Sequence, residues 1–157
     1  MKINFLKKIV LPYGFSLAEI LTVIAILIII AFITVPVIKQ YSSNLELNNS
    51  TKLLVSNIKL AQQNTVTQQF KYGVRLELLG RTFYLIQKEP SEQILDTLVL
   101  DEQVIFFNVS GLQDNEVIFN PTGAVDFSGF IELEHTVTHV KSRINIKPSG
   151  YVNWEKI

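Results

Sequence analysis

The most constraining feature of this 157-residue chain is an apolar run close to its N-terminus. Residues 20–38 are 19 consecutive residues without a charge, interrupted only by Thr22, Thr34 and Pro36. A helix rises 1.5 Å per residue, so about 20 such residues cross the ~30 Å hydrocarbon core of a bilayer. We therefore predict that residues 15–38 form a membrane-spanning helical segment.

The charges that flank this run indicate its orientation. The first 14 residues carry Lys2, Lys7 and Lys8 and no acid, whereas the rest of the chain has 11 basic and 14 acidic residues. Positively charged flanks stay on the cytoplasmic side, so we expect the N-terminus inside and the C-terminal part translocated. An ordinary cleaved signal would have a shorter apolar stretch and a small-residue cleavage site, which "TVPVIK" does not provide.

A single carboxylate, Glu19, stands at the start of the apolar run. An acidic side chain at the centre of a membrane helix costs roughly 2.5–3.5 kcal/mol. Glu19 either lies near the cytoplasmic interface, where this cost is small, or receives a partner that makes its burial tolerable. The residues around it favour a partner, because "GFSLAEILTVIAILIII" resembles the N-terminal signature of type IV prepilins and type II secretion pseudopilins.

This resemblance implies a processing and assembly pathway for the first 38 residues. Residues 1–14 would be a leader that a prepilin peptidase removes by cutting between Gly14 and Phe15, and Phe15 would then be N-methylated. Glu19 would pair with the new ammonium group of a neighbouring subunit. The implied partners are other pilins or pseudopilins in a helical filament, the peptidase, an inner-membrane assembly platform and the lipid bilayer. Pro36 stands where many family members have a helix-bending proline.

The helical pattern continues beyond the apolar run. Apolar residues recur at steps of 3, 4 or 7, and no Gly or Pro occurs between Val37 and Tyr72. We predict one helix over residues 15–70, whose amphipathic half, residues 39–70, lays an apolar stripe on a globular domain. The stripe is too short for a coiled coil. Its members are Ile38, Tyr41, Leu45, Leu47, Leu54, Ile58, Ala61 and Thr65.

Residues 71–157 change to the period-2 alternation of β-strands. In "YGVRLELL", Val74, Leu76 and Leu78 should share one face, and Gly80–Arg81 should form a two-residue turn to the next strand. We therefore predict an α+β, pilin-like fold in which the long helix packs on an antiparallel β-domain. The further predicted strands are "TFYLIQK", "LDTLVL", "VIFFNV", "EVIFN", "GFIELEH", "VKSRINIK" and "YVNW".

A second resemblance concerns the C-terminal strands. The order "VIFNPTGAVDFSGFIEL … SRINIKPSGYVNW" is similar to the GspH/FimT-type pseudopilin domain. That domain has a turn with Pro and Gly, then a strand and a terminal hairpin with Gly. The residues at matching places are Phe119, Pro121, Gly123, Ile144, Ile146 and Gly150.

The sequence gives little support for a catalytic or metal-binding site. The chain has no cysteine, no Gly-rich phosphate loop and no serine nucleophile motif. His135 and His139 are four residues apart, a spacing that holds a metal on a helix, but "ELEHTVTHV" reads as strand–loop–strand. We expect no enzyme activity, no cofactor and no metal.

The leading interpretation is a structural, minor pilin or pseudopilin. It would be a single-pass inner-membrane protein that enters a type IV pilus or a type II secretion pseudopilus. The alternative is a pilus-tip or competence pilin that binds DNA or a surface through its β-domain. Some FimT-type pilins bind DNA through basic residues in this region, where Lys141, Arg143 and Lys147 alternate on one strand face. A solvated strand face explains the same residues.

Overall fold

A computed structural model describes residues 14–157, apart from the side chains at positions 33, 35–37, 39 and 40. The chain divides into two compact units: the first ends at Ile38 and the second is Lys39–Ile157. Helix α1 (Leu17–Gln68) contributes to both units. The predicted helix over residues 15–70 is therefore confirmed to within two residues at each end.

The predictions for the N-terminal region meet the structure only in part. The leader lies outside the described residues, except for Gly14. Within the part of the chain that is described, no helix combines the length and the hydropathy that a membrane crossing requires. The membrane-spanning segment over residues 15–38 and the bend at Pro36 stay predictions.

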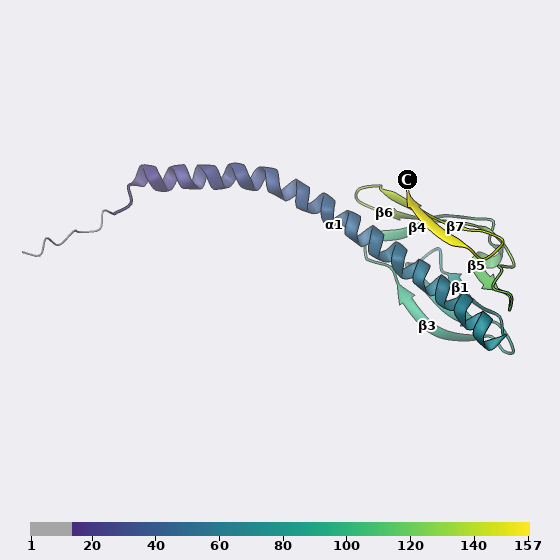
Figure 1. The fold of residues 1–157 in the computed structure, drawn as a ribbon. Helices are drawn as coiled ribbons and strands as arrows, with labels where there is room; N and C mark the ends of the chain where they lie inside the picture. The colour runs from purple at the N-terminus through teal and green to yellow at the C-terminus, as the bar shows by residue number, and fades with distance from the viewer. Residues whose placement is uncertain (1–13) are drawn as a thin grey trace, which may run out of the picture. The chain divides into compact units, whose positions relative to one another are not determined.

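After α1 the chain forms two four-stranded antiparallel sheets (Figure 1). The first sheet has the order β3-β2-β1-β5 and the second has the order β4-β6-β7-β8, so the chain moves from one sheet to the other between β3 and β4. It returns for β5, beside β1, after a short 3₁₀-helix, η1. The elements are β1 (Tyr72–Leu76), β2 (Thr82–Gln87), β3 (Gln93–Val99), β4 (Val104–Ser110), η1 (Gln113–Asn115), β5 (Glu116–Phe119), β6 (Gly129–His135), β7 (Lys141–Ile146) and β8 (Val152–Lys156).

One hydrophobic core joins both sheets to the part of α1 in the second unit. Figure 1 shows the teal end of the helix alongside the strands. Fully burying one aliphatic or aromatic side chain contributes roughly 1.5–3 kcal/mol, so this cluster is the main source of stability. Its most deeply buried members are Leu47, Leu54 and Ile58 from α1, Val74, Phe83 and Phe119 from the first sheet, and Ile131, Leu133 and Ile144 from the second.

Two details of the predicted pattern were wrong. The predicted buried stripe includes Ile38, Tyr41 and Leu45, but these residues are 60%, 66% and 42% exposed, because the core begins only at Leu47. The first strand is shorter than predicted, because β1 ends at Leu76 and Leu78 lies in a wider turn. In this turn the Gly80 N–H donates to the Glu77 carbonyl, and the Glu77 N–H donates to the Thr82 carbonyl. A leucine in that turn has no sheet to pack on.

Glycines fix the turns that the second resemblance singled out. Gly150 has φ +80°, and a Cβ there would lie 1.9 Å from the carbonyl oxygen of Gly123. Only glycine permits so close an approach in that left-handed conformation. The Gln62 amide of α1 donates to the carbonyls of Gly123 at 2.7 Å and Gly150 at 3.1 Å, so it ties both turns to the helix.

Candidate functional site

The N-terminal site begins just before the helix. Gly14, Phe15 and Ser16 are not helical, and all three are exposed. The Ser16 hydroxyl accepts a hydrogen bond from the Glu19 backbone N–H at 3.2 Å, and the Ser16 carbonyl accepts from Glu19 and Ile20. Ser16 is therefore the N-cap of α1. The pattern Ser-x-x-Glu in the sequence is a signal for such a cap, but the sequence analysis did not predict the cap.

Glu19 lies in the first turn of α1 with its carboxylate unpaired among the described residues. With Phe15 and Ile20, it lines a shallow surface depression of about 290 Å³, whose other lining residues are Val23 and Ile24. A carboxylate in the first turn interacts favourably with the helix dipole. This local role is compatible with a charged partner from another chain, because the dipole acts through the backbone and leaves the carboxylate oxygens free.

The apolar side chains of this segment are exposed all round. Leu21, Ile24 and Phe32 are 59%, 47% and 79% exposed, although fully apolar helices are normally buried. The two hydroxyls of the segment need no outside partner, because Thr22 donates to the Ala18 carbonyl and Thr34 to the Ile30 carbonyl, both at 2.8 Å. The surface is therefore suited to an apolar environment or to other helices.

The three basic residues of the DNA-binding alternative are spread along one strand of the second sheet. Lys141 and Arg143 share a face of β7, and Lys147 follows the end of the strand. Two of them are already paired with carboxylates: Lys141 lies 3.5 Å from Glu134, and Arg143 lies 2.5 Å from Glu132.

Each of these cations also lies over an aromatic ring. The ring centroids are 3.3 Å from Lys141 (Phe107), 4.8 Å from Arg143 (Phe130) and 5.4 Å from Lys147 (Tyr151). Such contacts are attractive but modest, about 0.5–1 kcal/mol at exposed sites. Of the three, Lys147 alone has no carboxylate partner among the described residues.

The two histidines point to different partners and do not converge on a metal site. His135, at the end of β6, is 2% exposed, and its Nε2 lies 3.1 Å from a carboxylate oxygen of Glu46 on α1. His139 lies in the following turn and contacts Glu134. No group of three metal-ligating side chains occurs in the described part of the chain.

His135 is a link between helix and sheet. Its Nδ1 accepts from the backbone N–H groups of Val137 and Thr138, both at 3.3 Å, so the ring hydrogen is on Nε2 and is donated to Glu46. This hydrogen bond, with a second from Ser42, lowers the pKa of Glu46. The contact is therefore structural, and sequence spacing did not reveal it because Glu46 and His135 are 89 positions apart.

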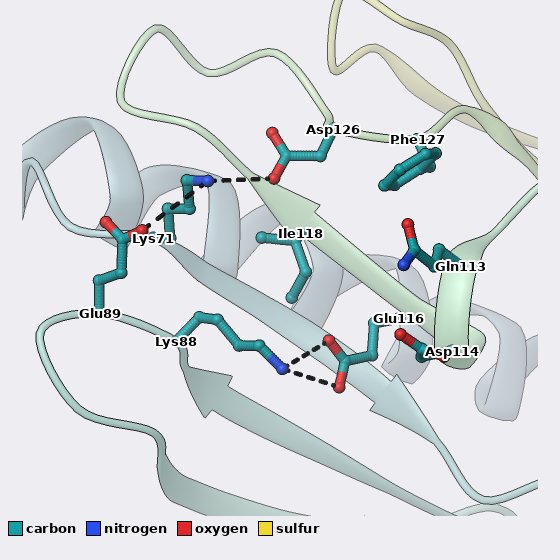
Figure 2. A pocket seen from close by; sticks show the side chains of 9 residues that line it. All are labelled: Lys71, Lys88, Glu89, Gln113, Asp114, Glu116, Ile118, Asp126 and Phe127. Atoms are coloured by element: carbon teal, nitrogen blue, oxygen red, sulfur yellow. Dashed lines mark hydrogen bonds and ion pairs between the residues drawn. The ribbon is translucent and has the colours of Figure 1, made fainter.

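The main polar cluster that the sequence did not reveal covers the outer face of the first sheet. Glu116 of β5, only 8% exposed, accepts from Arg75 of β1 at 2.5–2.6 Å and from Lys88 at 3.1 Å. Glu92 bridges the same two cations, at 2.6 Å from Arg75 and 3.0 Å from Lys88. Figure 2 shows the Lys88–Glu116 pair beside Ile118. The network joins β1 and β5 to the loop between β2 and β3, so no local motif could reveal it.

The network shifts the pKa of three of its members in the direction that favours their charged forms. Hydrogen bonds to Glu92, and then to Glu116, raise the pKa of Arg75 and of Lys88. Hydrogen bonds from Arg75 and Lys88 lower the pKa of Glu92. Arg75, Lys88 and Glu92 therefore stay charged over a wider pH range than they would alone.

Comparison with solved structures identifies the fold. The chain resembles the minor pseudopilin EpsH of the Type 2 Secretion System of Vibrio cholerae, with a TM-score of 0.59 and 12% identity over 71% of this chain and 97% of that chain. It also resembles the type IV minor pilin FimU of Pseudomonas aeruginosa, with a TM-score of 0.57 and 11% identity over 73% of this chain and 92% of that one. A second EpsH structure gives a TM-score of 0.56 at 15% identity, over 69% and 92% of the two chains.

These likenesses confirm the predicted α+β, pilin-like fold of the GspH type. No family model and no curated protein matches the sequence. At such low identity the shared property is the fold, and function has to be argued from the chain's own residues.

Proposed function

We propose that this chain is a minor pilin or pseudopilin, a structural subunit of a type IV pilus or a type II secretion pseudopilus. The observation that carries the proposal is a coincidence of two independent features. One is the stretch from Gly14 to Glu19 at the start of an apolar helix, and the other is a pilin-like fold in the rest of the chain. Either feature alone is weaker, because a signal anchor can be apolar and a fold can serve several functions.

In the proposed pathway the chain is inserted with its N-terminus in the cytoplasm and its β-domain outside. A prepilin peptidase hydrolyses the peptide bond between Gly14 and Phe15, which frees an ammonium group on Phe15, and the mature Phe15 is N-methylated. The exposed, non-helical conformation of Gly14–Ser16 supports this step, since a protease needs an extended and accessible bond.

Assembly then supplies the partner that Glu19 lacks among the described residues of its own chain. The carboxylate would pair with the ammonium group of a neighbouring subunit's Phe15, in an environment of apolar helices. A buried charge is strongly unfavourable when alone and tolerable when paired, so the pairing favours the filament over an isolated subunit in lipid. The exposed apolar surface from Ile20 to Phe32 would pack against the helices of other pilins.

Processing is tested by co-expressing the full-length chain with a prepilin peptidase and measuring the intact mass. We expect the loss of residues 1–14 from the wild type and no processing of Gly14→Ala. Gly80→Ala is a matched control, because a Cβ at Gly80 meets no atom closer than 3.7 Å. A wild-type chain that keeps its leader in the presence of an active peptidase would contradict the proposal.

A further inference from the structure

The four edge strands of the two sheets differ in how well their free sides are protected. β5 has only four residues, and the chain that follows covers its free side, where the Asp126 N–H donates to the Ile118 carbonyl at 3.0 Å. β8 has five residues and carries Glu155 and Lys156. The pairing of β4 is interrupted by a register shift after Phe106. Short strands, charged side chains and irregular pairing are the usual protections of a sheet edge.

β3 lacks these protections over most of its length, and it lies at the margin of the first sheet (Figure 1). It has seven residues, and six of them are exposed, the exception being the half-buried Leu98. Its irregularity, at Leu95, leaves residues 96–99 in regular register with β2. Ile94 and Val99 are 57% and 55% exposed. An exposed apolar edge of this length is suited to pairing with another strand.

The backbone of β3 offers hydrogen bonds to such a strand. In an antiparallel pair, every second residue directs its N–H and C=O to the neighbouring strand, and the residues between direct theirs away. The Thr97 N–H donates to the carboxylate of Asp96 at 2.8 Å, so it belongs to the set that points away from β2. Asp96 occupies this donor in the free protein. The carbonyl of an incoming strand would replace the carboxylate and release it for another contact.

The two faces of β3 differ in character. Asp96 stands opposite Leu85, a member of the core, and cross-strand partners share a face. Ile94, Thr97 and Val99 stand opposite the residues of β2 that alternate with its core residues, so they lie on the outer face of the sheet. An added strand would therefore meet apolar side chains on the outer face and a carboxylate on the other. Alternating apolar and charged residues satisfy both faces.

The charge around β3 decides the sign of those charged residues. Asp96, and Asp101 and Glu102 after the strand, have no cationic partner among the described residues. Arg81, whose carbonyl accepts from the N–H of the residue after β3 at 2.8 Å, offsets one of these charges. The sequence from residue 89 to residue 140 has no lysine or arginine. The edge is therefore complementary to a basic segment.

We propose that β3 is a docking edge for an extended segment of a different protein, in which apolar residues alternate with lysine or arginine. The segment would add an antiparallel strand to the first sheet through its main chain. Its apolar residues would cover Ile94 and Val99, and its basic residues would reach the carboxylate that Asp96 frees. The partner adds to a domain whose core is already closed. Such docking goes beyond the proposed function and does not depend on filament assembly.

The probe is a fluorescent synthetic peptide of about nine residues, a usual strand length, in which valine and lysine alternate. Fluorescence anisotropy measures its binding to the full-length chain in detergent, with detergent alone as the blank. Because Thr97 lies on the outer face, an antiparallel partner meets its outward N–H with residues of that same face, the valines. N-methylation of the valines should weaken binding by about tenfold, since two or more main-chain hydrogen bonds are lost.

Two further peptides control for other modes of binding. N-methylation of the lysines alters the opposite edge of the peptide and should leave its affinity unchanged, although composition and charge are the same as in the valine-methylated peptide. Replacing the lysines by glutamates should weaken binding, because like charges then face each other at the edge.

A change in the strand itself tests the same hydrogen bonds from the protein side. Thr97→Pro removes the outward N–H, and an edge strand tolerates proline where its N–H faces away from the sheet. Binding should weaken roughly fivefold, the effect of one main-chain hydrogen bond. Thr97→Val keeps the N–H and the branched shape, so it should bind as the wild type does. The fluorescence of Trp154, the only tryptophan, reports whether each variant is folded, and the methylated peptides decide the matter if the proline variant is not.

Hydrogen exchange locates the contact. Bound peptide should slow the exchange of the N–H groups in residues 93–99 and leave those of the edge strand β4 unchanged. Equal binding of the two methylated peptides, or protection of β4 in place of β3, would overturn the docking edge. Protection of β3 that grows with protein concentration in the absence of peptide would overturn it too, because the occupant would then be a second copy. Each of these failures would leave the proposed function intact, since none of the measurements involves processing or filaments.

Discussion

Two segments of one helix carry similar apolar residues in opposite surroundings. In the first unit, Ile24 and Ile26 are 47% and 52% exposed, whereas in the second unit Leu54 and Ile58 are 0% exposed. The second segment has two sheets to pack on, whereas the described residues of the first unit, 14–38, contain no strand. Composition alone does not separate the segments, because both are rich in leucine and isoleucine.

The difference lies in where each segment finds its partner. Leu54 and Ile58 gain their stabilisation when the chain folds, so a single copy completes that surface. Residues 20–32 expose more apolar surface than a monomeric soluble protein normally tolerates. In the proposed function, this surface is completed from outside the chain, by lipid first and by other subunits later. The predictions below test this division between a self-sufficient domain and an incomplete helix.

The largest effect should come from Glu19→Val. Without the carboxylate the helix is more apolar, so insertion should persist, but the partner of the Phe15 ammonium is lost. We expect the variant to be present in the membrane fraction and absent from sheared filaments. Glu19→Gln should behave in the same way, because it keeps the shape and loses the charge.

Ser16→Ala is the control for a purely local role of this turn. Losing an N-cap costs about 0.5–2 kcal/mol of helix stability, but it leaves the Glu19 carboxylate in place. Ser16→Ala should therefore still enter filaments. Normal incorporation of Glu19→Val, or equal loss for Ser16→Ala, would show that Glu19 acts only on its own helix.

A matched pair of isoleucine changes should give the next largest effect. Ile58→Ala removes a fully buried side chain from the core and should lower the free energy of unfolding by about 2–5 kcal/mol. Ile26→Ala removes an exposed side chain and should leave that free energy unchanged. Trp154 packs against the core from β8 and reports on the globular domain in detergent-solubilised full-length protein. Equal destabilisation by both changes would mean that the two segments do not differ in this way.

Much of the fold was accessible from the sequence because its signals are local. Apolar spacing predicted α1, and alternation with Gly and Pro turns located the strands, including the Lys147–Gly150 hairpin turn. The errors at Tyr41 and Leu78 have one cause: periodicity says which face a residue is on, but not whether the partner element reaches that far.

The candidate site was only partly accessible, for the same reason. Residues 14–19 form a contiguous motif, so their joint role could be hypothesised. The Arg75–Glu116 pair is separated by 41 positions and depends on β5 lying beside β1. The pairing of Glu46 with His135 likewise depends on how the helix crosses the second sheet. Sequence spacing carries no information about such contacts.

A smaller effect is expected from the link between Glu46 and His135. Because the folded state lowers the pKa of Glu46, this group contributes stability above its unfolded pKa, near 4.5, and loses it as the pH falls through the folded value. Glu46→Gln should therefore destabilise the domain at pH 7, and its difference from the wild type should shrink towards pH 3. Thermal unfolding followed by Trp154 fluorescence measures this. Glu102→Gln, at an exposed acid in a turn, should show no such trend.

The smallest effect is expected on DNA binding. Lys141 and Arg143 are neutralised by Glu134 and Glu132, and counterion release from DNA requires cations that are free to meet phosphates. Removing Lys141, Arg143 and Lys147 together by alanine substitution should change retention of DNA in filter binding by less than about twofold at moderate salt. A large, salt-dependent loss would show that DNA displaces the two glutamates, and it would make the second sheet a binding surface. The β-domain would then also have a surface that an outside partner completes, as the N-terminal helix has. The difference between these two regions would be smaller than proposed.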